Sequence, residues 1–265
     1  MRAIAFAAAL LMTSAPALAA GDLLVAPTRL ILDGGRGTEI VLNNVGAATA
    51  TYRVSLELRR MLPDGKLEEV AAGSETAKER AVAAMISYAP RRVTLPPNQP
   101  QTIRVGARLA PDTPDGEYRA HLLFRAIPDA TTPVASSTSR EGLSIALTPI
   151  YGVTIPVIVR KGTLSAVATL GDVRVLRGAE PQLVFTLTRQ GERSLYGRVR
   201  VTKPGVSKPL FEARGVAVYA EVNSRTVSLP LPPEVTAQMS GPIRVEYLED
   251  NDAGGLIAET QAVVR

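Results

Sequence analysis

The chain has 265 residues, 46% of them hydrophobic and 21% charged, which is typical of a soluble globular protein and suggests two domains. The formal net charge is +5, Cys and Trp are absent, and His121 is the only histidine. These counts exclude disulfides and Cys-ligated metals, and they argue against a His-centred metal site or a Ser-His-Asp triad. With only 4% aromatic residues, a base-stacking surface is also disfavoured. We therefore expect no metal, no cofactor and no nucleic-acid partner.

Residues 1–20 have the three parts of a secretory signal peptide. Arg2 supplies the positive charge, residues 3–12 form an apolar run too short to cross a membrane, and residues 17–19 read Ala-Leu-Ala, a small-residue cleavage site. No later run is long and apolar enough for a membrane-spanning helix. The sequence thus predicts an exported mature chain that starts near Gly21 and has no integral membrane segment.

Short segments of alternating hydrophobicity, separated by turn residues, fill the first half of the chain. The predicted strands are 23–32 (broken at Pro27), 38–42, 50–61, 91–95, 101–109 and 117–127. Residues 73–85 are polar, so we expect a mobile connection or one or two helical turns there, with Ser74 as the cap. About seven short strands at regular spacing favour an immunoglobulin-like β-sandwich over residues 21–161.

The last strand of this series, from Leu143 to Lys161, is long, apolar and rich in β-branched residues. Leu143, Ile145 and Leu147 share one face, and the period of two resumes after Pro149. Proline in a sheet belongs at an edge or a bulge, because it has no N–H to donate. A long apolar edge strand tends to pair with another chain. Two interpretations follow: an ordinary core strand of the sandwich, or a strand that pairs with a partner.

A second series of strands follows the boundary at Lys161–Gly162. The candidates are 164–170, 182–188, 196–202, 209–211, 216–219, 225–229, 242–248 and 256–264. The predicted fold class is therefore all-β, with an immunoglobulin-like domain over 21–161 and a smaller β-sandwich over 162–265. The linker is so short that the two domains should meet at a fixed angle.

Motifs for catalysis are missing from the sequence, so we do not expect an enzyme. It has no nucleophile elbow, no phosphate-binding glycine loop and no dinucleotide fingerprint. Arg29 stands out instead, because it interrupts an otherwise apolar strand. It is either a surface arginine whose stem packs on its neighbours or, if the strand faces a cleft, a side chain suited to binding a carboxylate through two parallel hydrogen bonds.

Several segments, in this order, resemble the periplasmic pilus chaperones of the chaperone–usher pathway. They are Pro27–Leu30 (the first strand with its arginine), Val93–Pro97 and Ile103–Val105 (the proline turn and following strand), Glu117–Pro128 (the penultimate strand), and Leu143–Leu147 with Ile155–Arg160 (the last strand). Each motif is weak by itself, but their ordered occurrence behind a signal peptide is specific. The resemblance covers the first domain, whereas the second matches only as a β-domain of suitable size.

The resemblance implies two immunoglobulin-like domains in a boomerang arrangement, a periplasmic location, and pilus or fimbrial subunits as partners. Such chaperones lend their last N-domain strand to a subunit that lacks one, and deliver the complex to an outer-membrane usher. Carried over to this sequence, the subunit-binding residues are Leu143, Ile145, Leu147 and Ile155. Arg29 would hold the subunit's C-terminal carboxylate.

One departure from the family concerns the second cation of that anchor. Family members pair the first-strand arginine with a lysine on the last strand, but the equivalent position here falls around Thr154–Pro156, where there is none. Arg160, Lys161 or Arg104 would replace it, or Arg29 would act alone, and the departure favours the archaic branch of the family. The sequence leaves open whether the free protein caps its own edge by dimerising. The alternative from another class is a structural or adhesive surface protein built from tandem β-sandwiches.

Overall fold

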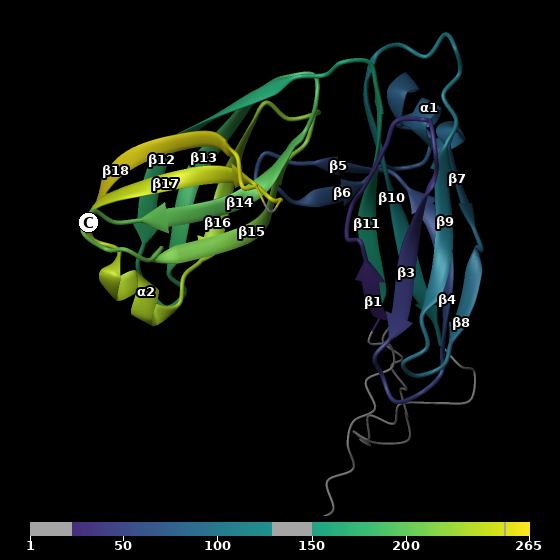
Figure 1. Ribbon diagram of the computed structural model, residues 1–265, viewed down its shortest axis with the longest axis horizontal. Helices are drawn as coiled ribbons and strands as arrows, with labels where there is room; N and C mark the ends of the chain where they lie inside the picture. The colour runs from purple at the N-terminus through teal and green to yellow at the C-terminus, as the bar shows by residue number, and fades with distance from the viewer. Residues whose placement is uncertain (1–22, 129–149, 252) are drawn as a thin grey trace, which may run out of the picture.

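The computed structural model describes residues 23–128, 150–251 and 253–265. The predicted signal peptide and the predicted subunit-binding residues Leu143, Ile145 and Leu147 lie outside the described residues. Over the described residues the chain forms two β-sandwiches and two short helices (Figure 1), so the prediction of an all-β, two-sandwich fold is confirmed. Neither of these helices is long and apolar enough to cross a membrane.

Domain 1 comprises the first eleven strands and one helix. Sheet A has the order β1-β3-β9-β7 and sheet B the order β2-β11-β10-β4-β8, while β5 and β6 form a separate hairpin. Neighbouring strands are antiparallel, except that β2 runs parallel to β11. The bounds are β1 (Leu23–Ala26), β2 (Leu30–Leu32), β3 (Thr38–Asn44), β4 (Ala50–Glu57), β5 (Arg59–Met61), β6 (Leu67–Glu69), α1 (Ala77–Met85), β7 (Ile86–Ala89), β8 (Arg92–Leu95), β9 (Gln101–Ala107), β10 (Gly116–Ile127) and β11 (Gly152–Lys161).

The predicted first strand is divided between the two sheets. Its first part, β1, pairs with β3, whereas its second part, β2, pairs with β11 in register Leu30 to Val157. Pro27 follows β1 directly and has no N–H to continue the ladder, so the chain crosses from sheet A to sheet B at this point. Arg29 therefore lies in the connection between two strands, and its predicted position inside a strand was wrong.

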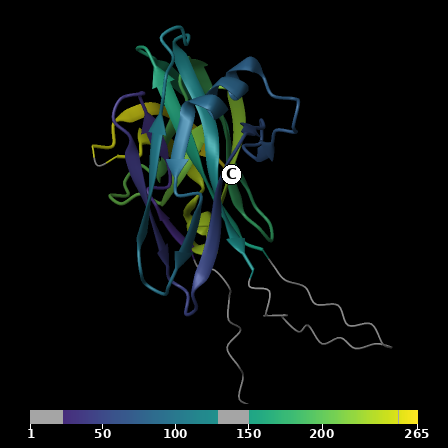
Figure 2. The same cartoon turned by 90° about the vertical axis from the view of Figure 1, so that its right-hand side faces the viewer.

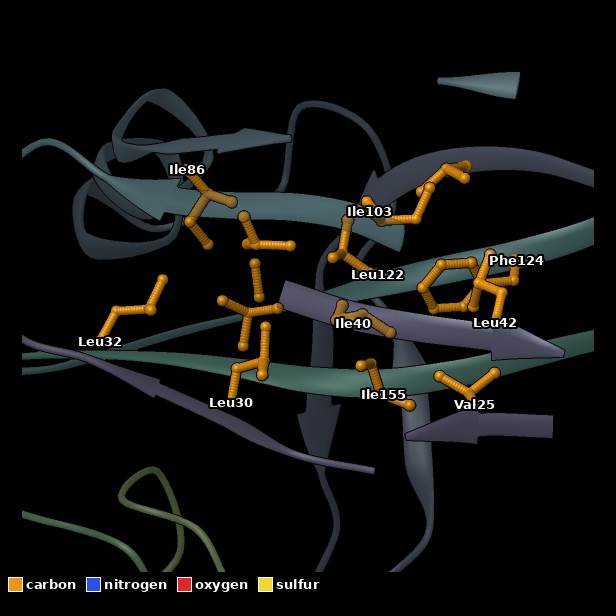
Figure 3. Close-up of a cluster of buried hydrophobic side chains, with 14 of the residues drawn as sticks. Val25, Leu30, Leu32, Ile40, Leu42, Ile86, Ile103, Leu122, Phe124 and Ile155 are labelled. Atoms are coloured by element: carbon orange, nitrogen blue, oxygen red, sulfur yellow. The ribbon is translucent and has the colours of Figure 1, made fainter. Parts of the chain in front are cut away.

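The core of domain 1 lies between sheets A and B (Figure 3). Ile40 and Leu42 from β3 face Leu122 and Phe124 from β10, and all four side chains are fully buried. Burying each such side chain stabilises the fold by roughly 1.5–3 kcal/mol. Ile155 of β11 belongs to the same core and is 2% exposed.

Helix α1 covers one end of this sandwich and packs against β10 (Figures 1 and 2). Its N-cap is Thr76, not the predicted Ser74, because Thr76 and Glu79 form a reciprocal capping box. Arg60 of the β5–β6 hairpin donates two hydrogen bonds of 2.7 Å to the Glu79 carboxylate. Hydrogen bonding from Arg60 is the main reason that the pKa of Glu79 falls to about 2.

Domain 2 packs a three-stranded sheet, β12-β13-β16, against a four-stranded sheet, β15-β14-β17-β18. The two short strands predicted at 209–211 and 216–219 form one strand. Between the predicted strands 225–229 and 242–248, where no helix is expected, the Pro232–Pro233 pair begins a helix, a position at which proline is favourable. The bounds are β12 (Ala166–Leu176), β13 (Gln182–Gly191), β14 (Leu195–Thr202), β15 (Phe211–Val218), β16 (Ser224–Pro230), α2 (Pro233–Gln238), β17 (Gly241–Glu249) and β18 (Leu256–Val264).

The two domains meet at an angle, with the β5–β6 hairpin between them (Figure 1). Met61 from the hairpin and Ile158 from β11 form a buried apolar cluster with Ala217 and Tyr219 of domain 2. At the hairpin turn, the carbonyl oxygen of Pro63 accepts a 2.8 Å hydrogen bond from the backbone N–H of Thr226. These contacts hold the domains in one relative orientation.

His121 lies beside this junction and is 1% exposed. Its Nε2 atom is 3.0 Å from Nη1 of Arg119. Because a guanidinium only donates, Nε2 must accept, and the neutral ring carries its proton on Nδ1. Burial, together with the charges of Arg119 and Arg59, lowers the pKa of His121 to about 3.

We expect the wild type to lose stability on acidification from about pH 6.5 to pH 5, and His121→Gln to lose less. The pKa of about 3 in the folded state lies below the ordinary unfolded value, so between the two values the unfolded chain binds a proton that the folded chain does not. The contribution of the neutral His121 side chain to the free energy of unfolding is complete above the pKa of the unfolded state. Below that pKa, the contribution falls by up to about 1.4 kcal/mol for each pH unit. Urea unfolding at several pH values measures the slope. Identical slopes for the two proteins would contradict a buried neutral imidazole.

Candidate functional site

A polar cavity of about 340 Å³ lies between the two domains. Arg29 and Arg160 line it from domain 1, and Arg193 and Tyr196 line it from domain 2. Glu249 and Asp250, at the end of β17, form part of its acidic side. The site thus brings the predicted anchor residue Arg29 together with two further arginines that are distant in the sequence.

The guanidinium of Arg29 stacks on Tyr196, with Cζ 3.8 Å from the ring centroid. This cation–π contact crosses the domain boundary, because Tyr196 belongs to β14. Burial lowers the pKa of Arg29, and the charge of Arg160 lowers it further, against an opposing effect of Tyr196. Among the described residues, no ion pair or hydrogen bond joins its guanidinium to a carboxylate. A carboxylate ligand would therefore relieve both the desolvation and the repulsion.

Arg160 is the second cation of the cavity, and a buried carboxylate fixes its position. Its Nε donates a 2.9 Å hydrogen bond to Oε2 of Glu117, which lies opposite Arg160 in the register of β10 and β11. Both oxygens of Glu117 also accept from the backbone N–H of Ser194 in domain 2, at 3.1 Å. The Glu117 side chain is 1% exposed. Arg160 is thereby held at the cavity while its Nη1 keeps no hydrogen bond within the described part of the chain.

The other two cations considered from the sequence lie elsewhere. The ammonium of Lys161 donates to the backbone carbonyl oxygens of Pro111, at 3.0 Å, and of Thr113. Arg104 lies on β9 of sheet A, is largely exposed, and pairs with Glu39 at 3.4 Å. Geometry therefore favours Arg160 as the partner of Arg29.

The acidic residues of the cavity are already engaged. Asp250 lies 3.6 Å from Arg214, and Oε2 of Glu249 accepts a 2.8 Å hydrogen bond from Asn251. Because these carboxylates have partners within domain 2, they do not neutralise the Arg29–Arg160 pair by direct contact. The arrangement suits an incoming anion that brings two oxygens, such as a peptide's terminal carboxylate.

The last strand of domain 1 has two different parts. Ile155 belongs to the core of its own domain and its side chain does not reach the surface, and its contact with a subunit stays a prediction. In contrast, Ile150 and Tyr151 are 48% and 52% exposed. In the sequence, these two are the described residues nearest to Leu143, Ile145 and Leu147, and both are apolar or aromatic.

Sequence reasoning found Arg29 but missed Glu117 and Tyr196. A weak signal for Glu117 was present, since three polar residues in succession occupy one face at the start of β10: Glu117, Arg119 and His121. Nothing local marked Tyr196, because its role depends on how the two domains dock. Within the described residues, no cluster of His, Asp and Glu could hold a metal ion.

No family model matches the chain, and no curated protein matches it. Solved structures of similar architecture include the E. coli chaperone DraB, which is 14% identical with a TM-score of 0.47 over 93% of this chain and 98% of that one. A chain of the CsuC–CsuE chaperone–tip adhesion subunit pre-assembly complex, from archaic chaperone-usher Csu pili of Acinetobacter baumannii, is 14% identical with a TM-score of 0.46 over 91% and 97%. A chain of the complex of SafA pilin with the SafB chaperone, from Salmonella enterica, is 18% identical with a TM-score of 0.43 over 92% and 96%.

These solved proteins are chaperones or chaperone–subunit complexes, the class that the sequence resembles. Identities of 14–18% and TM-scores of 0.43–0.47 describe a distant similarity. A shared fold does not define an activity, so the function has to follow from this chain's own residues.

We expect Glu117→Ala to lower the free energy of unfolding by roughly 2–5 kcal/mol, because it leaves Arg160 and the Ser194 N–H without their buried acceptor. Glu117→Gln keeps one acceptor oxygen and should lie between the wild type and the alanine variant. Glu39→Ala is the matched control, since that carboxylate is exposed and its pair with Arg104 should contribute little. Urea denaturation measures all three. Equal stability of Glu117→Ala and Glu39→Ala would contradict the role assigned to Glu117.

Proposed function

We propose that the protein is an exported chaperone of pilus or fimbrial subunits. It binds a subunit that lacks one strand, completes the subunit's sandwich with the segment around Leu143, Ile145 and Leu147, and passes it to an outer-membrane usher. The periplasm is the compartment in which such a step takes place. The observation that carries the proposal is the pair Arg29 and Arg160, which line one interdomain cavity without a carboxylate in direct contact with Arg29.

The pair supports this function because a subunit strand ends in a carboxylate. The guanidinium of Arg29 can donate two parallel N–H groups to the two oxygens, and Nη1 of Arg160 adds a further donor. A half-buried setting strengthens such bonds. A partly desolvated cation without a carboxylate in direct contact, such as Arg29, costs stability unless a ligand relieves it. Binding of a terminal carboxylate at this place would fix the position of one end of the guest strand.

The spacing along the sequence is compatible with this placement. Leu30, next to Arg29, pairs with Val157, so Arg29 lies close to the level of Pro156 on β11. Leu147 precedes Pro156 by nine residues in the sequence, a separation that would span about 30 Å if the chain were extended. A guest strand anchored at Arg29 would thus reach the apolar residues of the donor segment. Main-chain hydrogen bonds would supply affinity, and alternate apolar side chains would set the register.

We expect Arg29→Ala to reduce co-purification of a co-expressed candidate subunit at least tenfold, because a charge-assisted pair is worth about 1.5–3 kcal/mol. Arg104→Ala is the matched control, since it removes an arginine from domain 1 that lies away from the cavity. Affinity capture followed by quantification of the subunit measures the effect.

A guest variant separates binding of the carboxylate from a general effect of the mutation. A subunit extended by several residues at its C-terminus has no carboxylate at the cavity, so it should lose affinity for the wild type but little further affinity for Arg29→Ala. If Arg29→Ala recovers as much subunit as the wild type, the anchor is refuted. Incorporation of the protein itself into fibres would instead favour a structural surface protein.

We expect Ile145→Asp to abolish co-purification while the free protein stays folded, because a charge would have to enter an apolar pocket of the subunit. Ile145→Val keeps an apolar side chain and should keep most of the binding. Circular dichroism of the free variants tests folding separately from capture of the subunit. Normal recovery by Ile145→Asp would exclude this residue from the donated face.

A further inference from the structure

Three arginines stand in one row across sheet B of domain 1. Arg92 of β8 lies directly opposite Arg53 of β4, and Arg53 lies directly opposite Arg125 of β10. Directly opposed residues of antiparallel strands point to the same face, and neighbouring strands are about 4.8 Å apart. The fourth position of the row, on β11, is Gly152. The row is therefore a line of three positive side chains about 10 Å long.

All three side chains are exposed, and none has a carboxylate partner among the residues that the structure describes. Like charges directly opposite on adjacent strands are unfavourable. Domain 2 illustrates the usual arrangement, because there Arg200 lies opposite Glu212 and the two are 3.5 Å apart. Within the described chain, no carboxylate on a neighbouring strand offsets the charge of the arginine row. Domain 1 is not poor in such groups, because Asp and Glu are about as frequent in it as in the whole sequence.

The row lies on the same face of sheet B as the interdomain site. Along β10, Glu117, Arg119 and Arg125 share the face that points away from the core, since the alternate residues, from Tyr118 to Phe124, belong to the core of domain 1. Arg125 is eight residues from Glu117, or about 26 Å along the strand. The row thus lies at the end of sheet B remote from Arg160, next to the start of β11.

We infer that the arginine row is a docking surface for a short acidic stretch of a partner protein, in which aspartate or glutamate side chains lie across the strands. Carboxylates match guanidiniums in charge and in planar geometry, so they would remove the repulsion within the row. An anionic membrane is the less suitable occupant, because electrostatic membrane binding commonly uses clusters of four to eight basic residues. The row has three, and the adjacent positions Ser55 and Thr94 are uncharged. This inference does not require the proposed chaperone function.

The test uses a fluorescein-labelled hexaglutamate peptide and the full mature protein at low salt, where surface electrostatics is least screened. Fluorescence anisotropy should detect binding by the wild type, at least tenfold weaker binding by Arg53→Gln, and no binding of hexaglutamine. Arg36→Gln is the matched control, because it removes an equal charge from an exposed turn and should bind like the wild type. The melting temperature of free Arg53→Gln should equal or exceed that of the wild type, since one repulsive residue is gone.

Three results would overturn the inference. Equal binding of hexaglutamate by Arg53→Gln and Arg36→Gln would mean that only net charge matters. Binding of the wild type to vesicles that contain anionic phosphatidylglycerol, without binding to the peptide, would assign the row to a membrane surface. A lower melting temperature of Arg53→Gln, without loss of peptide binding, would make the arginine a structural residue.

Discussion

One buried carboxylate, that of Glu117, sets the geometry on which the rest of the molecule depends. A charged group that is 1% exposed is tolerated only if donors surround it, and its donors come from both domains: Arg160 of β11 and the backbone N–H of Ser194. Domain 2 must therefore remain where Ser194 reaches Glu117. Tyr196 follows Ser194 by two residues, so the same contact places its ring against Arg29. The orientation of the domains and the arrangement of the cation pair thus have a common cause.

The apolar cluster and the β5–β6 hairpin support the same orientation from a second side. Met61 and Tyr219 are buried across the boundary, and the Pro63 carbonyl accepts a hydrogen bond from Thr226. Two separate attachments resist a hinge motion that either alone would permit. A site formed in advance costs little ordering free energy when a ligand binds, so the interaction energy of a carboxylate is available as affinity.

Much of this fold could be predicted from the sequence because its strands are half-buried and alternate, as in β10, where Phe124 faces the core and Arg125 faces solvent. The division of the first strand between two sheets could not be predicted from the sequence, because it depends on which partner strand each half of the segment pairs with. Arg29 was found because an arginine in an apolar run is locally anomalous. Glu117 was missed because an acidic residue on the polar face of a strand is ordinary, and only the docking of domain 2 makes that position buried. The helix that begins at Pro233 was missed because a proline pair serves equally as a strand boundary and as a helix start.

The charge distribution assigns different tasks to the two domains. The four-stranded sheet of domain 2 pairs arginines with carboxylates on neighbouring strands, as in Arg200 with Glu212 and Arg244 with Glu259. One face of sheet B in domain 1 instead carries Arg160 near one end and the arginine row near the other. For a guest that lies along this face, two electrostatic contacts at different levels of the sheet would define its direction as well as its position. Exposed pairs of this kind add little affinity, whereas they raise the association rate and exclude the reversed orientation. Under the proposed function, domain 1 would select and align the guest, apolar residues of its last strand would provide most of the binding energy, and domain 2 would keep the anchor in place.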